Sequence, residues 1–392
     1  MVGRTECNSY LKIKLYKDEG EYKMSFPEIK KQLGFGCMRL PLLENGDVNN
    51  EEFKKMVDIF IESGFNYFDT AHGYLSGKSE IALRECLTSR HAREEYLLAN
   101  KLSHNFFEKE ADIRPFFESQ LEICGVDYFD FYLMHAQNSR YFEQYKACNA
   151  YEIAYELKKE GKIRHLGMSF HDTAEVLDRI LTEKPFMEFV QIQLNYLDME
   201  DAGVQSRLCY EVCRKHGKPV IIMEPVKGGR LVKLPEAAQD VLNGLNQNLS
   251  NASYAIRYAA SFEGVAMVLS GMSDMAQMGD NLSYMKDFKP FTKEEYEAVS
   301  KVCDILRRQD MIACTACRYC EDGCPKKIAI PDLFTCLNDV HTNTGNPKEA
   351  YRAFTEGKGK ASDCIGCGKC ERVCPQKLRI RTHLKEVAKV FD

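Results

Sequence analysis

Short apolar runs alternate with amphipathic segments over most of the chain. Eight of these runs predict buried strands, because they are short, rich in branched and aromatic side chains, and bounded by turn residues. They are Leu33–Gly36, Tyr67–Ala71, Tyr96–Lys101, Phe129–His135, Arg164–Phe170, Phe189–Tyr196, Val220–Pro225 and Ala266–Gly271.

Helical periodicity fills the intervals between most of these runs. The predicted helices are Glu51–Ser63, Lys78–Leu87, Ala111–Ile123, Phe142–Glu160, Ala174–Leu181, Gly203–His216, Pro235–Phe262 in one or two pieces, and Met275–Met285. Eight buried strands separated by helices over about 250 residues predict a (β/α)8 TIM barrel. An open doubly wound sheet is the alternative, and it is disfavoured because no G-x-G-x-x-G opens a helix after any strand.

Two copies of one cysteine pattern follow the predicted barrel. Each copy has the spacing C-x2-C-x2-C-x3-C-P, which is typical of bacterial ferredoxins that hold two 4Fe–4S clusters. In that arrangement the fourth cysteine of each run binds the other cluster. A zinc site is the alternative, but tetrahedral zinc has no use for the third cysteine of a run. The predicted cluster ligands are Cys314, Cys317, Cys320, Cys324, Cys364, Cys367, Cys370 and Cys374.

The change of pattern after residue 290 predicts the domain boundaries. A helix at Lys293–Gln309 leads into the first cysteine run, and a further helical segment at Ile330–Val340 lies between the runs. We therefore expect an N-terminal extension at 1–30, the barrel at 31–290 and a small, mostly helical, ferredoxin-like domain at 291–392. Met1–Lys23 precedes all of the recognisable pattern, and we assign it no role.

Composition narrows the class of protein. The chain has 392 residues, 44% of them apolar, and a net charge of −5, so no basic excess suggests nucleic acid or an anionic membrane as a partner. No run approaches the roughly 18 apolar residues of a spanning helix, and the first residues are too charged for a secretory signal. Nine further cysteines follow no disulfide spacing, which predicts a reducing, cytoplasmic location.

Four titratable residues lie where the predicted strands end, which is the functional face of such a barrel. They are Asp69, Tyr74, Lys101 and His135. Singly, each is more typical of a turn or a packed side chain. Together, on three consecutive strands, they suit carbonyl reduction. We expect Lys101 to lower the pKa of Tyr74, the proton donor, while Asp69 keeps Lys101 charged and His135 holds the carbonyl oxygen.

The chain resembles the aldo-keto reductase superfamily, and in particular the branch with a ferredoxin-like tail that carries two 4Fe–4S clusters. That resemblance implies a (β/α)8 barrel, an Asp–Tyr–Lys–His tetrad formed by the four residues above, and an oxidoreductase that acts on an aldehyde, ketone, sugar or alcohol. The motifs that carry it are Leu33-Gly34-Phe35-Gly36-Cys37-Met38-Arg39-Leu40-Pro41, Phe68-Asp69-Thr70-Ala71-His72-Gly73-Tyr74, Asn100-Lys101, Leu133-Met134-His135 and Ile163-Arg164-His165-Leu166-Gly167-Met168-Ser169.

The resemblance also implies a nicotinamide dinucleotide, NADP(H) or NAD(H). Ser169 and Gln191 match residues that hold the carboxamide in that family, whereas Phe170 stands where the family has Asn and Glu224 where it has a stacking Tyr. The choice between NADPH and NADH therefore stays open.

Two further segments bear on the nucleotide. The segment that begins Ser270-Gly271, after the eighth strand, lacks the basic residues that the family offers to a 2′-phosphate, whereas Asn281 matches an adenine contact. Lys227-Gly228, after the seventh strand, lies where barrels commonly bind phosphate. The alternative interpretation of this segment is a tight, solvated turn without a ligand.

Nicotinamides deliver two electrons as a hydride, whereas each cluster passes one electron at a time. Three accounts of how the clusters relate to the barrel site follow. The clusters are structural or regulatory beside a plain reductase, or an external ferredoxin or flavoprotein feeds electrons through them to the barrel, or a bound flavin joins the two sites. A non-enzymatic electron-transfer subunit is a further alternative, and the four residues of the tetrad argue against it.

Overall fold

The computed structural model describes residues 26–308, 311–342 and 345–392. The segment Met1–Lys23, to which the sequence analysis assigns no role, lies outside the described residues.

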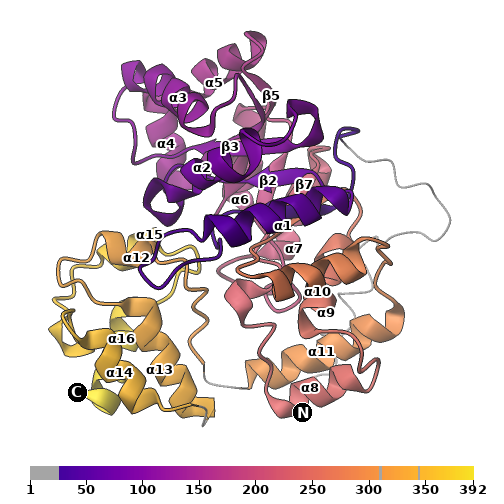
Figure 1. Cartoon of the computed structure of the whole chain (residues 1–392). Coiled ribbons are helices and arrows are strands. Elements are labelled where there is room, and N and C mark those ends of the chain that lie inside the picture. Colours follow the sequence, from indigo (N-terminus) through magenta and orange to yellow (C-terminus); the bar gives the residue numbers. More distant parts are fainter. Residues whose placement is uncertain (1–25, 309–310, 343–344) are drawn as a thin grey trace. The chain divides into compact units, whose positions relative to one another are not determined.

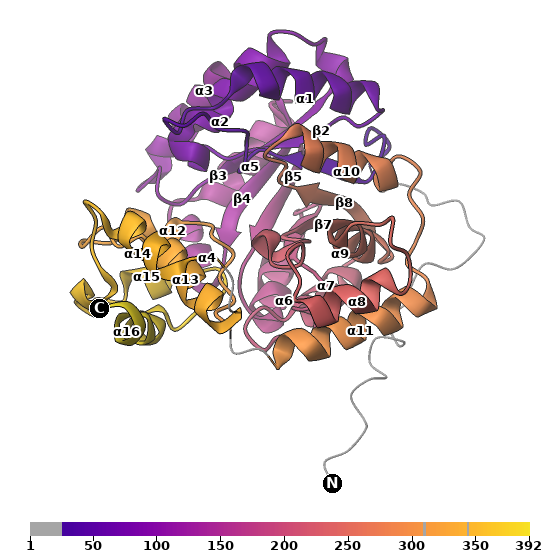
Figure 2. The same ribbon diagram turned by 60° about the horizontal axis from the view of Figure 1, so that its bottom comes forward.

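Eight parallel strands close into a barrel in chain order, from β1 to β8. The predicted (β/α)8 barrel is therefore confirmed, and helices surround the strands on the outside (Figures 1 and 2). The strands are β1 (Leu33–Gly36), β2 (Tyr67–Asp69), β3 (Leu97–Leu102), β4 (Phe129–Gln137), β5 (Ile163–Phe170), β6 (Val190–Gln193), β7 (Val220–Met223) and β8 (Val265–Ser270).

Amphipathic helices cover the barrel because each has one apolar stripe to bury. In α1 the side chains of Phe53, Met56, Val57 and Phe60 are buried, and Asn49 caps the first turn by accepting a hydrogen bond from the backbone of Glu52. The helices of the barrel are α1 (Asn50–Glu62), α2 (Lys78–Leu83), α3 (Glu110–Cys124), α4 (Ser139–Ala147), α5 (Ala150–Lys159), α6 (Ala174–Glu183), α7 (Ser206–Lys215), α9 (Asn251–Ala260) and α10 (Met275–Met285).

The single helix predicted over Phe142–Glu160 is wrong, since the structure forms two helices there, α4 and α5. They are separated at Asn149, whose φ of +55° lies in the left-handed region. Asparagine tolerates this conformation better than most residues, so the break costs little.

Large side chains fill the barrel interior. Phe26, Tyr67, Phe131 and Phe189 belong to one buried apolar cluster. A Cβ at Gly167 on β5 would lie 2.5 Å from the ring of Phe189, so this ring occupies space that only glycine leaves open.

The chain divides into two compact units. The barrel unit contains residues up to Pro225 together with Ala252–Tyr296, and the tail unit contains Val226–Asn251 together with Glu297–Asp392. This division differs from the predicted 31–290 and 291–392, because the segment Val226–Asn251 after β7 packs with the tail.

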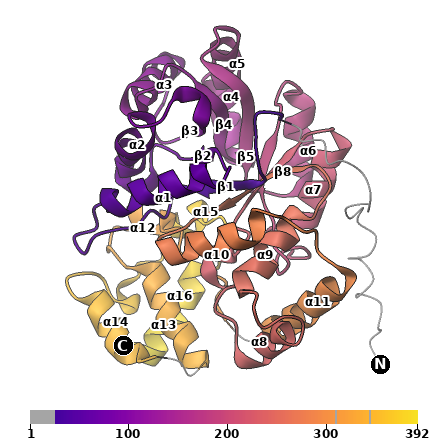
Figure 3. The same ribbon diagram turned by 45° about the vertical axis from the view of Figure 1, so that its right-hand side comes forward.

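The tail unit is helical and has a core of its own (Figure 3). Leu333, Phe334, Leu337, Tyr351 and Leu384 are buried together in it, with Cys320 and Cys370. Sequence analysis missed α14 and α16. The helices are α8 (Glu236–Asn243), α11 (Lys293–Arg307), α12 (Tyr319–Asp322), α13 (Ile330–Thr342), α14 (Pro347–Thr355), α15 (Lys369–Val373) and α16 (Ile380–Phe391).

Across the described ranges of the chain, every helix is too short or too polar to cross a membrane.

Candidate active site and cysteine pockets

Asp69, Tyr74, Lys101 and His135 lie together at the carboxyl ends of β2, β3 and β4. The Lys101 ammonium donates to Asp69 Oδ1 and to the Thr70 carbonyl oxygen, each at 2.6 Å. Its Nζ atom lies 4.8 Å from the centroid of the Tyr74 ring. The His135 ring packs edge-on to that phenol, with the two ring centroids 6.2 Å apart.

The Lys101–Asp69 ion pair is buried on both sides. Burial raises the pKa of Asp69 against the pull of Lys101, and burial lowers the pKa of Lys101 against the pull of Asp69. The second carboxylate oxygen, Asp69 Oδ2, is buried without a hydrogen-bond partner among the described residues. Neither charge is tolerable alone at this depth, so each side chain depends on the other.

The expected lowering of the Tyr74 pKa is wrong for this structure. Burial raises the pKa of Tyr74 well above its usual value, and the charge of Asp69 raises it further. The nearby Arg39 lowers the pKa and Glu224 raises it. Tyr74 therefore rests in its protonated form.

His135 is held as a neutral imidazole. Burial lowers its pKa well below the usual value, and the charge of Lys101 lowers it further. Its Nδ1 atom lies 2.6 Å from the Ser103 hydroxyl, and the Tyr145 hydroxyl donates to its backbone carbonyl at 3.2 Å. When the Ser103 hydroxyl donates to Nδ1, the ring proton sits on Nε2, where it can hydrogen-bond a substrate oxygen.

Sequence analysis missed Ser103, Thr70 and Cys37. Ser103 follows Lys101 by two positions, so strand alternation alone places both side chains on one face. Thr70 acts through its backbone oxygen, which no side-chain pattern reveals. Cys37 is fully buried beside the ion pair, and burial raises the pKa of its thiol, with Asp69 contributing in the same direction.

A buried amide and carboxylate network fixes the backbone of Lys101. Asn100 Oδ1 accepts from the Lys101 backbone N–H at 2.8 Å, and Asn100 Nδ2 donates to Glu80 at 2.7 Å. Gln120 donates to the Lys101 carbonyl oxygen at 3.2 Å. Asn100, Glu80 and Gln120 are all fully buried, which leaves Lys101 little freedom to move.

The two residues that match carboxamide contacts differ in the hydrogen bonds that they make to other protein groups. Ser169 Oγ accepts from the Ala136 backbone N–H at 2.8 Å, and its own proton is still available to a ligand. Gln191 is 2% exposed, and its Oε1 atom has no hydrogen-bond partner among the described residues. A buried amide oxygen without a partner is costly, so Gln191 suits a bound donor such as a carboxamide NH2.

Ser270 and Asn281 are engaged with protein groups. Asn281 Nδ2 donates to Ser270 Oγ at 2.6 Å, and the Tyr284 hydroxyl donates to Asn281 Oδ1. A Cβ at Gly271 would lie 3.3 Å from Arg39 Cβ, so the loop after β8 passes closely over Arg39.

Glu224 and Lys227 lie in different units. Glu224, directly after β7, belongs to the barrel unit, has a φ of +56° and affects the pKa of Tyr74. Lys227 is 3% exposed, and its ammonium donates to Gln376 of the tail unit at 3.1 Å. The glycine after it, Gly228, is so close to Thr315 that a Cβ would lie 2.4 Å from the Thr315 carbonyl oxygen. The predicted phosphate site is therefore a turn packed into the tail.

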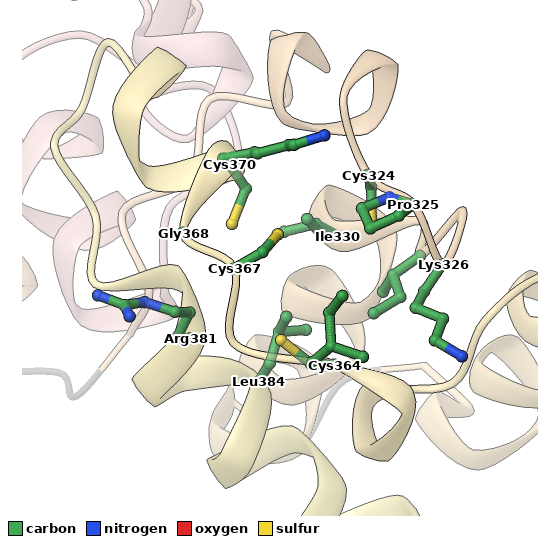
Figure 4. Close-up of a pocket in the computed structure, with 13 residues that line it drawn as sticks. Cys324, Pro325, Lys326, Ile330, Cys364, Cys367, Gly368, Cys370, Arg381 and Leu384 are labelled. Carbon is green, nitrogen blue, oxygen red and sulfur yellow. The ribbon is translucent and has the colours of Figure 1, made fainter.

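Four cysteines line an open pocket in the tail. Cys364, Cys367 and Cys370 come from the second run, and Cys324 is the last cysteine of the first run. Figure 4 shows Cys364 and Cys367 on one loop and Cys370 at the start of the helix that follows, with Cys324 across the pocket from them. Cys324 thus lies with the second run, which is the position that the predicted exchange of the fourth cysteine requires.

The other four cysteines form a second group. Burial raises the pKa of the Cys320 thiol, and charge on Cys317, Cys314 or Cys374 would raise it further. These four thiolates would repel one another without a cation, so the group suits a metal centre that supplies positive charge. Every cysteine in the described residues is free of disulfides.

The donor set of both groups fits iron–sulfur clusters, since four thiolates face each site. Within the described ranges no three His, Cys, Asp or Glu side chains already lie at ligand distances from one centre.

Comparison with protein families identifies both the barrel and the cysteine-rich tail. A family model described as the aldo/keto reductase family matches residues 32–304. A second model, described as a 4Fe-4S dicluster domain, matches residues 313–378, a range that contains all eight cysteines of the two runs.

Two curated proteins illustrate the range of relatives. An uncharacterized oxidoreductase of Bacillus subtilis, YqkF, is 22% identical over 298 residues, which cover 68% of this chain and 91% of that protein. The NADH-specific methylglyoxal reductase of Escherichia coli is 28% identical over 207 residues, which cover 48% of this chain and 60% of that protein.

Solved structures share the barrel. The aldo-keto reductase AKR11C1 of Bacillus halodurans, in its holo form, has a TM-score of 0.57 at 24% identity, and the match covers 71% of this chain and 96% of that one. An aldo-keto reductase of Klebsiella pneumoniae in complex with NADPH has a TM-score of 0.56 at 18% identity, covering 71% and 95%. At these identities the likeness concerns the fold.

Proposed function

Because this chain belongs to the aldo/keto reductase family and is an oxidoreductase with an appended 4Fe-4S dicluster domain, we propose that its barrel interconverts a small carbonyl compound and the corresponding alcohol. The observation that carries the proposal is the convergence of Asp69, Tyr74, Lys101 and His135 at one end of the barrel. A protonated phenol, a buried ammonium and a neutral imidazole in one site suit proton delivery to a carbonyl oxygen.

In the proposed reaction His135 and Tyr74 bind the carbonyl oxygen through two hydrogen bonds and so fix the orientation of the substrate. As the carbonyl carbon is reduced, charge develops on its oxygen, and the Tyr74 hydroxyl donates its proton there. The Lys101 ammonium next to the phenol then stabilises the tyrosinate. A raised pKa makes Tyr74 a weaker acid in the resting site. The proton transfer stays favourable because the alkoxide that forms is a far stronger base than the phenolate.

We propose that the electrons of this step arrive as a hydride from a nicotinamide dinucleotide, which supplies that chemistry when bound. Ser169 and the unpaired Oε1 of Gln191 support the proposal, since both could hold a carboxamide. Ser270, Asn281, Lys227 and Gly228 add no support, because each contacts another part of the protein.

We propose that Cys314, Cys317, Cys320 and Cys374 hold one 4Fe–4S cluster, and that Cys324, Cys364, Cys367 and Cys370 hold the other. Such clusters supply one-electron transfer when bound. In this proposal the last cysteine of each run joins the first three of the other run, and the pocket in Figure 4 supports the grouping for Cys324.

The test is the variant Tyr74→Phe, assayed with methylglyoxal and related aldehydes as probes and with NADH and NADPH in parallel. Methylglyoxal is chosen because the E. coli relative is named for it. We expect turnover to fall at least 100-fold, since general acid catalysis is typically worth 10²–10⁴, while cofactor binding, measured by fluorescence, stays unchanged.

Tyr155→Phe is the matched control, because Tyr155 lies on α5 and packs against Phe186, away from the tetrad. It should retain full turnover. Unchanged turnover in Tyr74→Phe with every active substrate would contradict the proposal.

A further inference from the structure

The pocket formed by Cys324, Cys364, Cys367 and Cys370 has a cationic rim. Lys326, Lys369 and Arg381 line it, and no Asp or Glu is among the lining residues. All three cations are exposed. In Figure 4, Lys326 and Arg381 extend to opposite sides of the cysteines, so positive charge surrounds the opening.

The charge of the surrounding sequence reinforces this rim. Residues 357–392 contain nine Lys and Arg but only four Asp and Glu, whereas the whole chain has a net charge of −5. Two acidic side chains close to the cysteine loop are engaged. Glu371 bridges to Arg381 at 2.7 Å, and Asp363 accepts from the Lys360 backbone N–H at 2.8 Å. Exposed Lys358 and Lys360 precede the cysteine loop.

An apolar side chain and a cysteine are exposed inside the cationic rim. Ile365, next to Cys364, is 62% exposed, which is the largest value for a big hydrophobic side chain in the described part of the chain. Cys367 is exposed as well. A protein that docks on Ile365 would thus lie one side chain away from a cluster ligand.

The other group of cysteines is covered within its own unit. The turn Lys227–Gly229 packs on Thr315, which lies between Cys314 and Cys317, and Lys227 bonds Gln376, two residues after Cys374. Cys320 in this group and Cys370 in the other are both buried, and Cys367 is the exposed cysteine of the eight. Of the two groups, the one in the open pocket is therefore the more accessible.

We propose that the rim formed by Lys326, Ile365, Lys369 and Arg381 docks a small acidic protein that carries one electron at a time. Charge complementarity selects the partner, because a negative surface is attracted to the cations, and Ile365 gives the contact an apolar centre. In the transfer, the reduced centre of the partner loses one electron and the cluster held by the open pocket gains it, with no bond made or broken. The proposal rests on the dicluster domain and not on carbonyl reduction in the barrel.

The test uses the full-length protein with its clusters, handled without air, and a small acidic bacterial ferredoxin reduced beforehand with dithionite that is then removed. Bleaching of the visible cluster band gives the rate of transfer, and biosensor measurements give Kd at several salt concentrations. For the double variant Lys326→Glu/Lys369→Glu we expect Kd to rise at least ten-fold at low salt, and transfer to slow accordingly. Wild-type Kd should rise with salt.

The matched control is Lys348→Glu/Lys389→Glu, which makes the same charge change with exposed lysines of the tail that do not line the pocket. It should bind as the wild type does. The milder pair Lys326→Gln/Lys369→Gln, checked for unchanged iron content, separates lost docking from a damaged cluster.

Three results would overturn the proposal. In the first, reduced ferredoxin leaves the clusters oxidised although dithionite bleaches them. In the second, both double variants weaken binding equally. In the third, duplex DNA binds as tightly as ferredoxin, which would show an unselective polyanion surface. None of these results depends on the aldehyde assay, so failure of this proposal and failure of the proposed barrel activity are distinguishable.

Discussion

Individual side chains of the tetrad are tuned by burial more than by their neighbours' charges. Burial raises the pKa of Tyr74 and lowers that of His135, so both are uncharged in the resting site. The Lys101 ammonium, paired with Asp69, lies 4.8 Å from the centroid of the Tyr74 ring, where it can stabilise the phenolate once the proton has left. This arrangement favours a proton donor that acts late, when charge has developed on the substrate.

Ser103 is predicted to position His135. In Ser103→Ala the imidazole Nδ1 loses its partner, and a lost hydrogen bond of about 1 kcal/mol corresponds to a roughly five-fold lower kcat. Steady-state kinetics with an accepted aldehyde measure the effect. Ser103→Thr keeps a hydroxyl and should recover most of the rate, and a Thr variant as slow as the Ala variant would refute the positioning role.

At this scale the sequence predicts which residues gather, but not how they are charged. The four tetrad positions follow from strand ends, and the structure places them together. The protonation of Tyr74 does not follow, because it depends on the depth of the site and on the charge of Asp69. Likewise, the contacts of Lys227 depend on the tail, more than a hundred residues away in sequence.

Among the elements, the short turn Lys227–Gly229 after β7 has the most consequential contacts. It belongs to the tail unit, and its packing on Thr315 requires a residue without a side chain at Gly228. The positive φ of +65° adds a second reason for glycine.

Gly228→Ala is predicted to loosen the tail around its first cysteine run. The new Cβ would overlap the backbone of Thr315, so this turn and the Cys314–Cys317 loop must separate. We expect a lower iron content per chain and faster loss of the visible cluster band in air.

Gly229→Ala is the control for the Gly228 variant. Its φ of +97° is also unfavourable for alanine, yet no atom lies within 4 Å of the added Cβ among those described. If both variants lost iron equally, backbone strain and not the contact with Thr315 would be responsible.

The prediction of elements succeeded where apolar runs were long and failed near local breaks. All eight strands were anticipated within a few residues, because each is buried on both sides and reads as continuous apolar sequence. The split between α4 and α5 depends on one left-handed residue, Asn149. The missed helices α14 and α16 flank the second cysteine run, and the sequence analysis predicted no helix after Ile330–Val340.

On the scale of the whole molecule, two cores stabilise the chain separately. The barrel core is made of large apolar side chains, whereas the tail core includes Cys320 and Cys370 among its buried residues. The tail should therefore depend on iron for its stability, and the barrel should not.

Removal of iron is predicted to unfold the tail unit selectively. The protein purified without air should contain about eight irons, four for each cluster. After treatment with an iron chelator, we expect hydrogen exchange to accelerate in Glu297–Asp392 and in Val226–Asn251, while strands β1–β8 stay protected. Mass spectrometry of peptic fragments measures this directly. Protection of Val226–Asn251 that persists with the barrel strands would contradict the division into units.

The chain crosses between its two units three times, at Pro225, at Asn251 and at Tyr296. A domain fused end to end would need only one crossing and could be removed or transplanted by a single cut. Here, a gene shortened after Tyr296 would still encode the segment Val226–Asn251, stripped of everything it packs against. We therefore expect truncation after Tyr296 to expose the side chains that are buried in this segment, such as Leu231 and Leu242.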